Sequence, residues 1–369
     1  MPRRYFTAAL VMLFLLAGCT TAQRRVSNHE RRIPAIELST GDIFGKKSPS
    51  QIDLYMQQVS ELGIGIIRTD LKWSDAVRNS VSSFNWDAAS AVIDAAARHG
   101  LLIHAIIDSP PAWDVAVSCL QPWKCAPFYP EGLAVFAAAL VARFKSRLVT
   151  AEVLNEPNAL PDYARDPARY AQLYRVVYNS VKAVAPALTI EPGGTAAIGT
   201  SGPDGLSAPD WYHALYAQGL GPQMDLLSVH PYTWPATPAD HDTSGNWAQL
   251  EQVLTIARSN GDPHKQLDLN EVGFPTGGGD VTPAADRFPR YHPGQPVTEA
   301  NQALFFKDVF SLFEQQLRAG TAARIGVYTL QDNNSGDTVG PESHFGISLP
   351  NGTPKPAWQV VRLEVKQLG

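Results

Sequence analysis

The stretch AEVLNEPN, residues 151–158, begins with alternating apolar residues and stops at a proline, with Asn155 and Glu156 just before the stop. A second stretch, LDLNEVGFPT at residues 267–276, repeats this design and places Glu271 where its apolar run ends. Short apolar runs that end at proline or glycine predict buried strands. Two carboxylates that each follow such a strand suggest a pair with a shared task.

Short apolar runs alternate with helical periods along most of the chain. The eight strands that we expect are residues 33–38, 64–70, 101–107, 149–154, 188–191, 224–230, 266–271 and 325–330. They are near-continuous apolar runs, which is typical of parallel strands buried on both faces. Eight strand-helix units predict an α/β fold of the (β/α)8 TIM-barrel type in a single domain. An open doubly wound sheet is the alternative, but residues 38–41 lack the glycine-rich phosphate turn that it requires.

The beginning of the chain predicts export. Arg3 and Arg4 precede an apolar run, residues 8–16, that is too short to span a bilayer comfortably. The run leads into Leu-Ala-Gly before Cys19, which resembles a bacterial lipoprotein signal that is cut before a lipidated cysteine. The expected organisation is therefore a signal peptide, a tether and one folded domain, at residues 1–18, 19–32 and 33–369. A secretory peptide in which Cys19 is incidental is the alternative, so we expect either a membrane-anchored envelope lipoprotein or a secreted protein.

The other two cysteines, Cys119 and Cys125, lie close together in an expected loop. An exported chain meets an oxidising compartment, which favours a disulfide between them. A metal site is the alternative, but no histidine or further cysteine stands nearby at ligand spacing. We therefore expect neither a metal nor a cofactor.

The composition limits the classes of partner. The chain has 369 residues, of which 44% are hydrophobic, and a formal charge of -5. This charge gives no support for a nucleic-acid surface, which needs a basic excess. Eight tryptophans and twelve tyrosines suit a protein that stacks sugars on aromatic faces, and they suit a large core equally well. The oligomeric state is not indicated.

The active site of such a barrel forms at the carboxyl ends of the strands. The polar residues that we expect there are Glu37, Arg68, Asp70, Asp108, Asn155, Glu156, His230, Tyr232, Glu271, Gln331 and Asp332. Glu156 and Glu271 would follow strands four and seven, on nearly opposite walls, so their side chains can meet across the mouth. A single carboxylate at such a position is more often a helix cap or an ion-pair partner.

Four motifs in this order resemble the retaining (β/α)8 glycoside hydrolases of clan A, near family 39. They are Arg68 on strand two, Asn155-Glu156-Pro157 on strand four, His230-Pro231-Tyr232 on strand six and Asn270-Glu271-Val272-Gly273 on strand seven. The tail from Phe345-Gly346 to residues 355–358 is similar to the close of bacterial members linked to exopolysaccharide. The resemblance covers nearly the whole chain after the tether.

The resemblance implies a division of work between the two glutamates. Glu271 would attack the anomeric carbon, and Glu156 would act as general acid and then as general base. In retaining enzymes the two carboxyl groups lie roughly 5–5.5 Å apart. Arg68 and Tyr232 would hold Glu271 as a carboxylate, while His230 would orient a neighbouring side chain.

Other residues would contact the sugar. Asn155 would bond its 2-hydroxyl group, and Trp113 and Trp234 on mouth loops would stack on sugar rings or simply pack. Tyr328 stands on strand eight where the clan usually carries tryptophan, which leaves the identity of the sugar open.

The implied substrate is an oligo- or polysaccharide of the cell envelope or the extracellular space, with galactofuranose-containing galactan as one candidate. A carbohydrate-binding lipoprotein on a non-catalytic barrel is the second hypothesis. A metal-dependent barrel hydrolase is the third, but it would need His-x-His on the first strand, where Ile36-Glu37-Leu38 stands.

Overall fold

The structure is a computed structural model. It describes residues 34–76, 83–116, 125–127, 129–234, 238, 246–277, 298–333 and 341–368, all within one compact unit of residues 34–369. The expected signal peptide, the tether with Cys19, and Cys119 lie outside the described residues. Lipidation of Cys19 and the disulfide between Cys119 and Cys125 therefore stay predictions. None of the described helices has the length and apolarity that crossing a membrane requires.

Eight parallel strands of the described chain form one sheet in the order β5-β4-β3-β2-β1-β8-β7-β6. They are β1 (Ile36–Ser39), β2 (Ile66–Lys72), β3 (Leu102–Asp108), β4 (Leu148–Val153), β5 (Thr189–Pro192), β6 (Leu227–Ser228), β7 (Leu267–Val272) and β8 (Ala322–Tyr328). The edge strands β5 and β6 also meet, because Asp225 donates to the Ile190 carbonyl at 3.0 Å and Thr195 donates to the Ser228 carbonyl at 3.2 Å. The sheet therefore nearly closes, and the predicted (β/α)8 barrel is confirmed.

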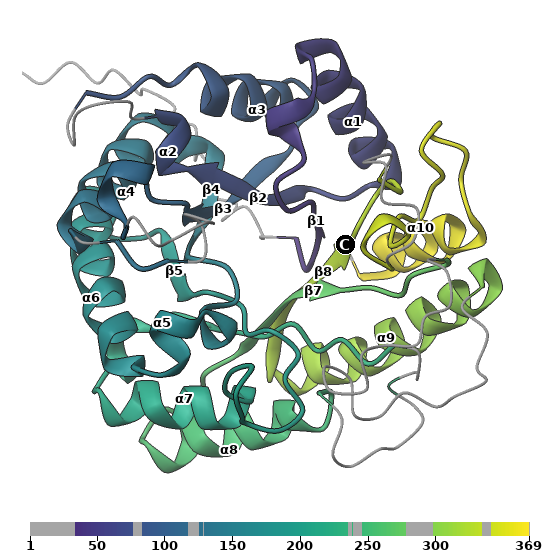
Figure 1. Ribbon diagram of the computed structural model, residues 1–369. Coiled ribbons are helices and arrows are strands. Elements are labelled where there is room, and N and C mark those ends of the chain that lie inside the picture. The colour runs from purple at the N-terminus through teal and green to yellow at the C-terminus, as the bar shows by residue number, and fades with distance from the viewer. Residues whose placement is uncertain are drawn as a thin grey trace, which may run out of the picture. The chain divides into compact units, whose positions relative to one another are not determined.

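Helices surround the strands on the outside (Figure 1). They are α1 (Pro49–Leu62), α2 (Trp73–Ala76), α3 (Asp87–Arg98), α4 (Pro130–Phe144), α5 (Pro161–Ala164), α6 (Pro167–Val184), α7 (Ala208–Ala217), α8 (Gln249–Ser259), α9 (Glu299–Ala319) and α10 (Pro356–Leu368). Local sequence sets their ends. For example, Ser48 and Gln51 form a reciprocal capping box at the start of α1, and Gly63 ends that helix with a φ of 85°.

The inward face of the strands differs from the expected apolar lining. Both faces are buried, but the following inward residues are polar or charged and at most 3% exposed: Glu37, Arg68, His104, Thr150, Glu152, Glu191, Asp268, Asn270 and Arg324. Glu37 was expected at the end of its strand. It lies instead inside β1, with its carboxylate 3.0 Å from His104 Nδ1. Arg68 likewise lies in the middle of β2, because that strand continues to Lys72.

Candidate active site

Glu156 and Glu271 come together at the mouth of the barrel. Glu156 follows β4, and Glu271 is the fifth residue of β7. One oxygen of each carboxylate and one ring nitrogen of His230 all lie within 4.8 Å of one another. So close an approach of one oxygen from each carboxylate is compatible with retaining glycosidases, whose carboxyl groups lie roughly 5–5.5 Å apart.

The backbone after β4 turns sharply to present Glu156. Leu154 and Glu156 both have positive φ angles, 65° and 51°, which residues other than glycine rarely adopt. The strain is held by neighbours, since the Glu156 amide donates to the Gly194 carbonyl at 3.0 Å. Strained backbone that the surrounding structure enforces is characteristic of functional sites.

Gly194 allows close contact beneath this turn. A Cβ atom at this position would lie 2.2 Å from His230 Nε2 and 2.5 Å from Asn270 Oδ1. Only glycine therefore lets the chain after β5 approach His230, which follows β6, and Asn270 on β7.

Glu271 is fixed through both of its oxygens. Arg68 Nη1 donates to Oε1 at 2.6 Å, and the Tyr232 hydroxyl donates to Oε2 at 3.0 Å. The Glu271 side chain is 9% exposed, whereas that of Glu156 is 36% exposed. Glu271 is thus held rigidly in a largely dry position, and Glu156 stands where water can reach it.

His230 connects the two carboxylates. Its Nε2 lies 3.4 Å from Arg68 Nη2, an atom that can only donate, so Nε2 is the acceptor. Nδ1 therefore carries the hydrogen and donates to Glu156 Oε1 at 3.0 Å, while it lies 3.5 Å from Glu271 Oε2. This arrangement leaves Oε2 of Glu156 available to hold a proton.

Asn155 is oriented by the same arginine. Its Oδ1 accepts a hydrogen bond of 2.9 Å from Arg68 Nη2. Because the oxygen is occupied in this way, the amide NH2 group of Asn155 is the part left to donate to a ligand.

The predicted aromatic residues have different environments. Tyr328, Tyr232 and Phe345 pack edge to face, with ring centroids 5.5–6.3 Å apart. Trp234 is buried, with its ring 6.2 Å from that of Phe345. Trp113 lies in a short helical turn after β3, packs against Trp73 with ring centroids 5.6 Å apart, and is 41% exposed, so it is the more exposed of the two predicted tryptophans.

A layer of ion pairs that the sequence did not predict lies beneath the two glutamates. Glu152 receives two hydrogen bonds from Arg68, at 2.6 and 2.8 Å, and lies 3.1 Å from His104 Nε2. His104 is also 3.0 Å from Glu191, which is 3.5 Å from Arg324. The sequence signal was a polar residue at every second position of a buried strand, as in Thr150 and Glu152.

The charges of this layer support one another. Burial alone would lower the pKa of His104, but the carboxylates of Glu37 and Glu191 raise it well above its usual range. Burial alone would raise the pKa of Glu152, but Arg68 and His104 lower it below its usual range. His104 is therefore an imidazolium at neutral pH, and Glu152 is a carboxylate that orients Arg68.

Three groups of described residues have ligand atoms spaced closely enough to hold a metal ion: Glu156 with His230 and Glu271, Glu37 with His104 and Asp268, and His104 with Glu152 and Glu191. Arg68 or Arg324 pairs with a carboxylate of each group. A protonated His104 has no lone pair to offer a metal in either interior group. The donor sets therefore fit internal ion pairing better than metal binding.

No protein-family model and no curated protein matches the sequence. Solved structures are similar in fold. A family 39 glycoside hydrolase from Bacteroides cellulosilyticus WH2 matches 92% of this chain with a TM-score of 0.67 and 19% identity, and this chain spans 64% of its length. A subfamily 18 member of family 5 from Streptomyces cattleya, in complex with GlcNAc, matches 91% of this chain and 80% of its own, with a TM-score of 0.65 and 16% identity.

A third similar structure is a monomeric β-xylosidase from Caulobacter crescentus CB15. It matches 90% of this chain and 67% of its own, with a TM-score of 0.59 and 19% identity. Identities this low establish the fold alone. The expected resemblance to barrel glycoside hydrolases is confirmed at that level.

Proposed function

We propose that the protein is a retaining glycoside hydrolase that cleaves β-glycosidic bonds in a cell-envelope or extracellular polysaccharide. The observation that supports this best is the close approach of Glu156 and Glu271 over a shared histidine. Here Arg68 and Tyr232 hold Glu271, while Glu156 stays more exposed.

The geometry supports a double displacement. In the first step, a Glu271 oxygen attacks the anomeric carbon while Glu156 gives its proton to the glycosidic oxygen. The bond between that carbon and oxygen breaks, and a glycosyl ester of Glu271 forms. In the second step, ionised Glu156 takes a proton from water, the water oxygen attacks the same carbon, and Glu271 leaves. Two inversions give net retention.

The neighbouring residues have supporting roles in this proposal. Arg68 and Tyr232 place the Glu271 carboxylate and stabilise it after the ester breaks. His230 orients Glu156 through Nδ1, and Asn155 donates to the sugar 2-hydroxyl, a contact that strengthens in the transition state. Trp113, Trp234 and Tyr328 complete the proposed sugar-binding residues.

The location and the polymer are supported by sequence features alone. A lipid anchor at Cys19, or simple secretion, would place the enzyme where wall and capsular polysaccharides are found. A galactofuranose-containing galactan is one candidate substrate. The second candidate function, a carbohydrate-binding lipoprotein, predicts sugar binding without turnover.

Hydrolysis of a panel of aryl β-glycosides tests the proposal. We expect wild-type turnover, loss of at least 10³-fold in kcat for Glu271→Ala, and partial rescue of that variant by azide, which enters the vacated space. Glu61→Ala, on the exposed surface of α1, is the control and should keep full activity. The first product seen by NMR should have the β configuration. An α product, or no turnover of any aryl glycoside or galactan, would refute the proposal.

A further inference from the structure

The carboxyl ends of β4 and β5 are joined by a tyrosine hydroxyl from the surrounding helices. Tyr170 lies on α6, outside the strands, and is fully buried. Its hydroxyl donates to the Val153 carbonyl at 2.9 Å and accepts a hydrogen bond of 2.9 Å from the Gly193 amide. Val153 is the last residue of β4, and Gly193 directly follows β5. One side chain therefore links the two strands just before the turn that carries Glu156.

The surroundings of Tyr170 keep this link in place. Burial raises the pKa of its hydroxyl well above the usual value, so the hydrogen that bonds the Val153 carbonyl stays on the oxygen at neutral pH. The ring packs against Trp211 and Tyr163, with centroids 5.1 and 5.6 Å away. The hydroxyl group is therefore held in one position, as a donor to β4 and an acceptor from Gly193.

A carboxylate holds the next residue from inside the barrel. Glu152 Oε1 accepts a hydrogen bond of 2.7 Å from the Gly194 amide. The same oxygen accepts a bond of 2.8 Å from Arg68 Nη2, and Oε2 accepts one of 2.6 Å from Arg68 Nε. The guanidinium thus orients the carboxylate, and the carboxylate fixes Gly194. Residues 193 and 194, which we call the glycine segment, are therefore held from both sides of the sheet.

The glycine segment supports the turn that presents Glu156. The Gly194 carbonyl accepts the Glu156 amide at 3.0 Å. Gly193 packs against the same turn, because a Cβ atom there would lie 2.4 Å from the Leu154 carbonyl oxygen. The positive φ angles of Leu154 and Glu156 are unfavourable, so this backbone depends on its neighbours to keep its shape. A shift of the glycine segment would therefore move Glu156.

We propose that Tyr170 and Glu152 are positioning residues for Glu156. They hold the glycine segment from opposite sides of the sheet, and that segment sets where the proposed general acid stands. The proposal rests on the proposed glycosidase function, because it assigns residues to the placement of that acid.

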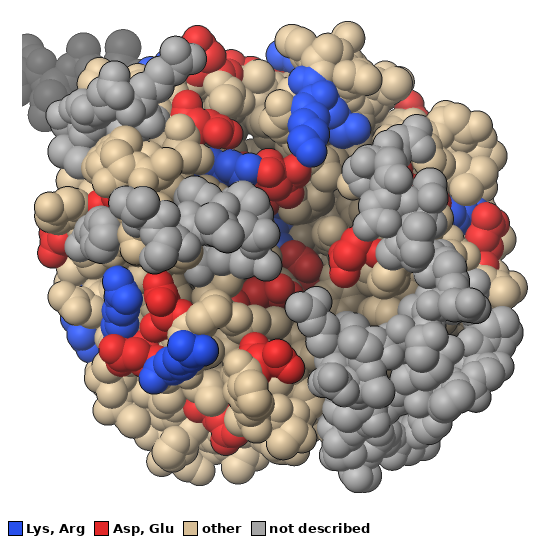
Figure 2. Space-filling view, viewed as in Figure 1, with Lys and Arg blue, Asp and Glu red and all other residues tan. Residues whose placement is uncertain are grey.

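Tyr170 acts without contact to the substrate. Viewed down the barrel, the surface is hollowed at its centre, and acidic side chains gather at the edge of the hollow (Figure 2). Tyr170 is fully buried and contributes nothing to this surface. A sugar that enters the hollow therefore does not touch Tyr170, and any effect of its hydroxyl on the reaction passes through the residues that it holds.

Misplacement of a general acid has its own kinetic signature. A phenyl glycoside has a poor leaving group and needs a proton on the glycosidic oxygen as the bond breaks, whereas a dinitrophenolate leaves without one. The ratio kcat/KM reports the steps up to formation of the glycosyl ester, and not its later hydrolysis. A fault limited to Glu156 therefore lowers kcat/KM for the phenyl glycoside and spares the dinitrophenyl glycoside.

Kinetics of Tyr170→Phe on matched phenyl and dinitrophenyl β-glycosides test the proposal. The variant keeps the ring and removes only the oxygen. We expect kcat/KM to fall by about 10–100-fold for the phenyl glycoside, since small errors in the placement of a catalytic group cost this much, and to stay within threefold for the dinitrophenyl glycoside.

Tyr174→Phe is the matched control. Tyr174 is also fully buried on α6, and its hydroxyl lies 3.2 Å from the Ile190 carbonyl and 2.8 Å from the Gln223 carbonyl. Neither carbonyl belongs to the glycine segment. This variant loses a comparable hydroxyl, so it should lose comparable stability while kcat/KM stays within threefold on both glycosides. The same selective loss in Tyr174→Phe would overturn the proposal.

Glu152→Gln should affect both glycosides. A glutamine side chain has one acceptor oxygen and a donor NH2 group, so it cannot accept from Arg68 at both of its ends. Arg68 also holds Glu271, which attacks either substrate. We expect kcat/KM to fall at least tenfold on both glycosides, and further on the phenyl glycoside. Equal falls would overturn the role of Glu152 toward Glu156.

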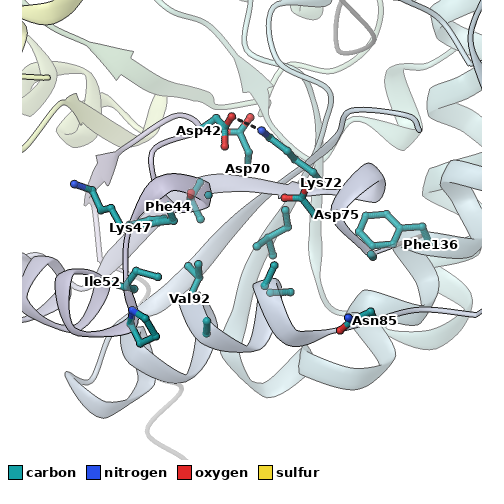
Figure 3. Close-up of a pocket in the computed structure, with 18 residues that line it drawn as sticks. Asp42, Phe44, Lys47, Ile52, Asp70, Lys72, Asp75, Asn85, Val92 and Phe136 are labelled. Atoms are coloured by element: carbon teal, nitrogen blue, oxygen red, sulfur yellow. Dashed lines mark hydrogen bonds and ion pairs between the residues drawn. The ribbon is translucent and has the colours of Figure 1, made fainter. Parts of the chain in front are cut away.

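A general loss of stability is tested elsewhere in the fold. Figure 3 shows a cavity of about 220 Å³ that is lined by residues of β2, α1 and α3, with Ile52 and Val92 on its wall. Val92→Ala removes apolar atoms there and should lower the thermal midpoint without changing the ratio of the two kcat/KM values. A changed ratio in this variant would show that any destabilisation produces the effect, and would overturn the proposal.

Hydrogen exchange tests the placement of Glu156 without turnover. Its amide is bonded to the Gly194 carbonyl, so it should exchange slowly in the wild type. NMR should show exchange at least tenfold faster in Tyr170→Phe and within threefold of the wild type in Tyr174→Phe.

The outcomes separate this proposal from the hydrolase proposal. If exchange accelerates as expected but the wild type cleaves no aryl glycoside, the hydrolase proposal fails and the holding of Glu156 by Tyr170 stands. If the wild type is active and Tyr170→Phe lowers kcat/KM equally on both glycosides, or on neither, the hydrolase stands and the positioning proposal fails. Wild-type exchange of the Glu156 amide in Tyr170→Phe refutes the positioning proposal in either case.

Discussion

Arg68 and Glu271 are 203 positions apart in the chain, and their side chains are joined by a hydrogen bond of 2.6 Å inside the barrel. The same guanidinium also bonds Glu152 twice, Asn155 at 2.9 Å and Ser39 at 2.8 Å. Arg68 therefore fixes residues of β1, β4 and β7 relative to one another. Arg68 thus places Glu271 directly, and it lies against Asn155 and His230, which adjoin and orient Glu156.

Arg68→Lys should be far from conservative. An ammonium group keeps the charge but cannot match the planar fork that satisfies Glu152 and Glu271 together. We expect kcat/KM on the best aryl glycoside to fall by about 10²–10³-fold, and the free energy of unfolding to fall by about 3 kcal/mol because a buried carboxylate loses its partner. Kinetics and urea unfolding measure the two effects. Arg98→Lys, in an exposed pair with Asp53, is the control. Wild-type kinetics in Arg68→Lys would contradict the assigned role.

Gly194→Ala should disturb the site without changing any charge. The added methyl group would lie 2.2 Å from His230 Nε2, so the imidazole must shift and its hydrogen bond to Glu156 is disturbed. We expect kcat to fall by about 10–100-fold, a range typical for lost acid-base assistance. Gly202→Ala is the matched control, since a Cβ there meets nothing within 4 Å. Equal kcat values for the two alanine variants would show that His230 is not held as described.

His104 should make stability fall at alkaline pH. Its pKa in the folded protein is raised well above 6.5, so the folded state holds a proton that the unfolded state releases above that pH. The stabilisation is complete below pH 6.5 and is lost as the pH rises, at up to about 1.4 kcal/mol per pH unit. Urea unfolding between pH 6 and 9 should therefore show a steeper decline for wild type than for His104→Asn. His213→Asn, exposed on α7, should follow the wild type. Parallel profiles for wild type and His104→Asn would refute this.

Asp70→Asn should make the protein more stable at neutral pH. The pKa of Asp70 is raised to about 6, above the 3.8 of a free aspartate, because burial penalises the ionised form. The cost to stability builds up between pH 3.8 and about 6, where the unfolded state has released a proton that the folded state keeps, and it is complete above about pH 6; an amide avoids this cost. We expect a gain on the order of 1–2 kcal/mol at pH 7.5 that vanishes below about pH 4.

Asp53→Asn should change the stability at neutral pH in the opposite direction and serves as the comparison. The pKa of Asp53 is lowered by its hydrogen bond from Arg98, so removal of that carboxylate should slightly destabilise the protein at pH 7.5. If Asp70→Asn also destabilised the protein at pH 7.5, the prediction that the ionised Asp70 carboxylate lowers stability would be wrong.

The order of strands and helices could be predicted because its signals are local. Apolar runs and helix caps placed the fourth strand at residues 149–154, and the structure has β4 at Leu148–Val153. The sixth strand shows the limit of this reasoning. It was expected over residues 224–230, but β6 comprises only Leu227–Ser228. The chain before β6 forms a short helical turn at Gly221–Gln223. The hydropathy of a segment does not show whether its backbone groups form hydrogen bonds with a neighbouring strand.

The sequence shows which inward residues are charged, but it does not show which of them contact one another. His104, Glu152 and Glu191 come from three strands, and the partners of His104 are 48 and 87 positions away from it in the chain. A single sequence holds no information on which inward side chains meet, because that depends on strand register and barrel stagger. The two glutamates were easier to place because each stands where its strand ends. Asp70 and Asp108 were also expected at strand ends, but the hydrogen bond between them depends on strand register in the same way.

The charged lining beneath the site has an evolutionary consequence. Loss of one charged residue leaves its buried partner without a counter-ion. Replacement of these residues one at a time by aliphatic residues therefore passes through variants that fold poorly. Homologous barrels should therefore either keep all five charged residues or carry apolar residues at all five positions. The residues are Glu37, His104, Glu191, Asp268 and Arg324. Sequences with a partial set would mark lineages in which another side chain has taken over the missing charge.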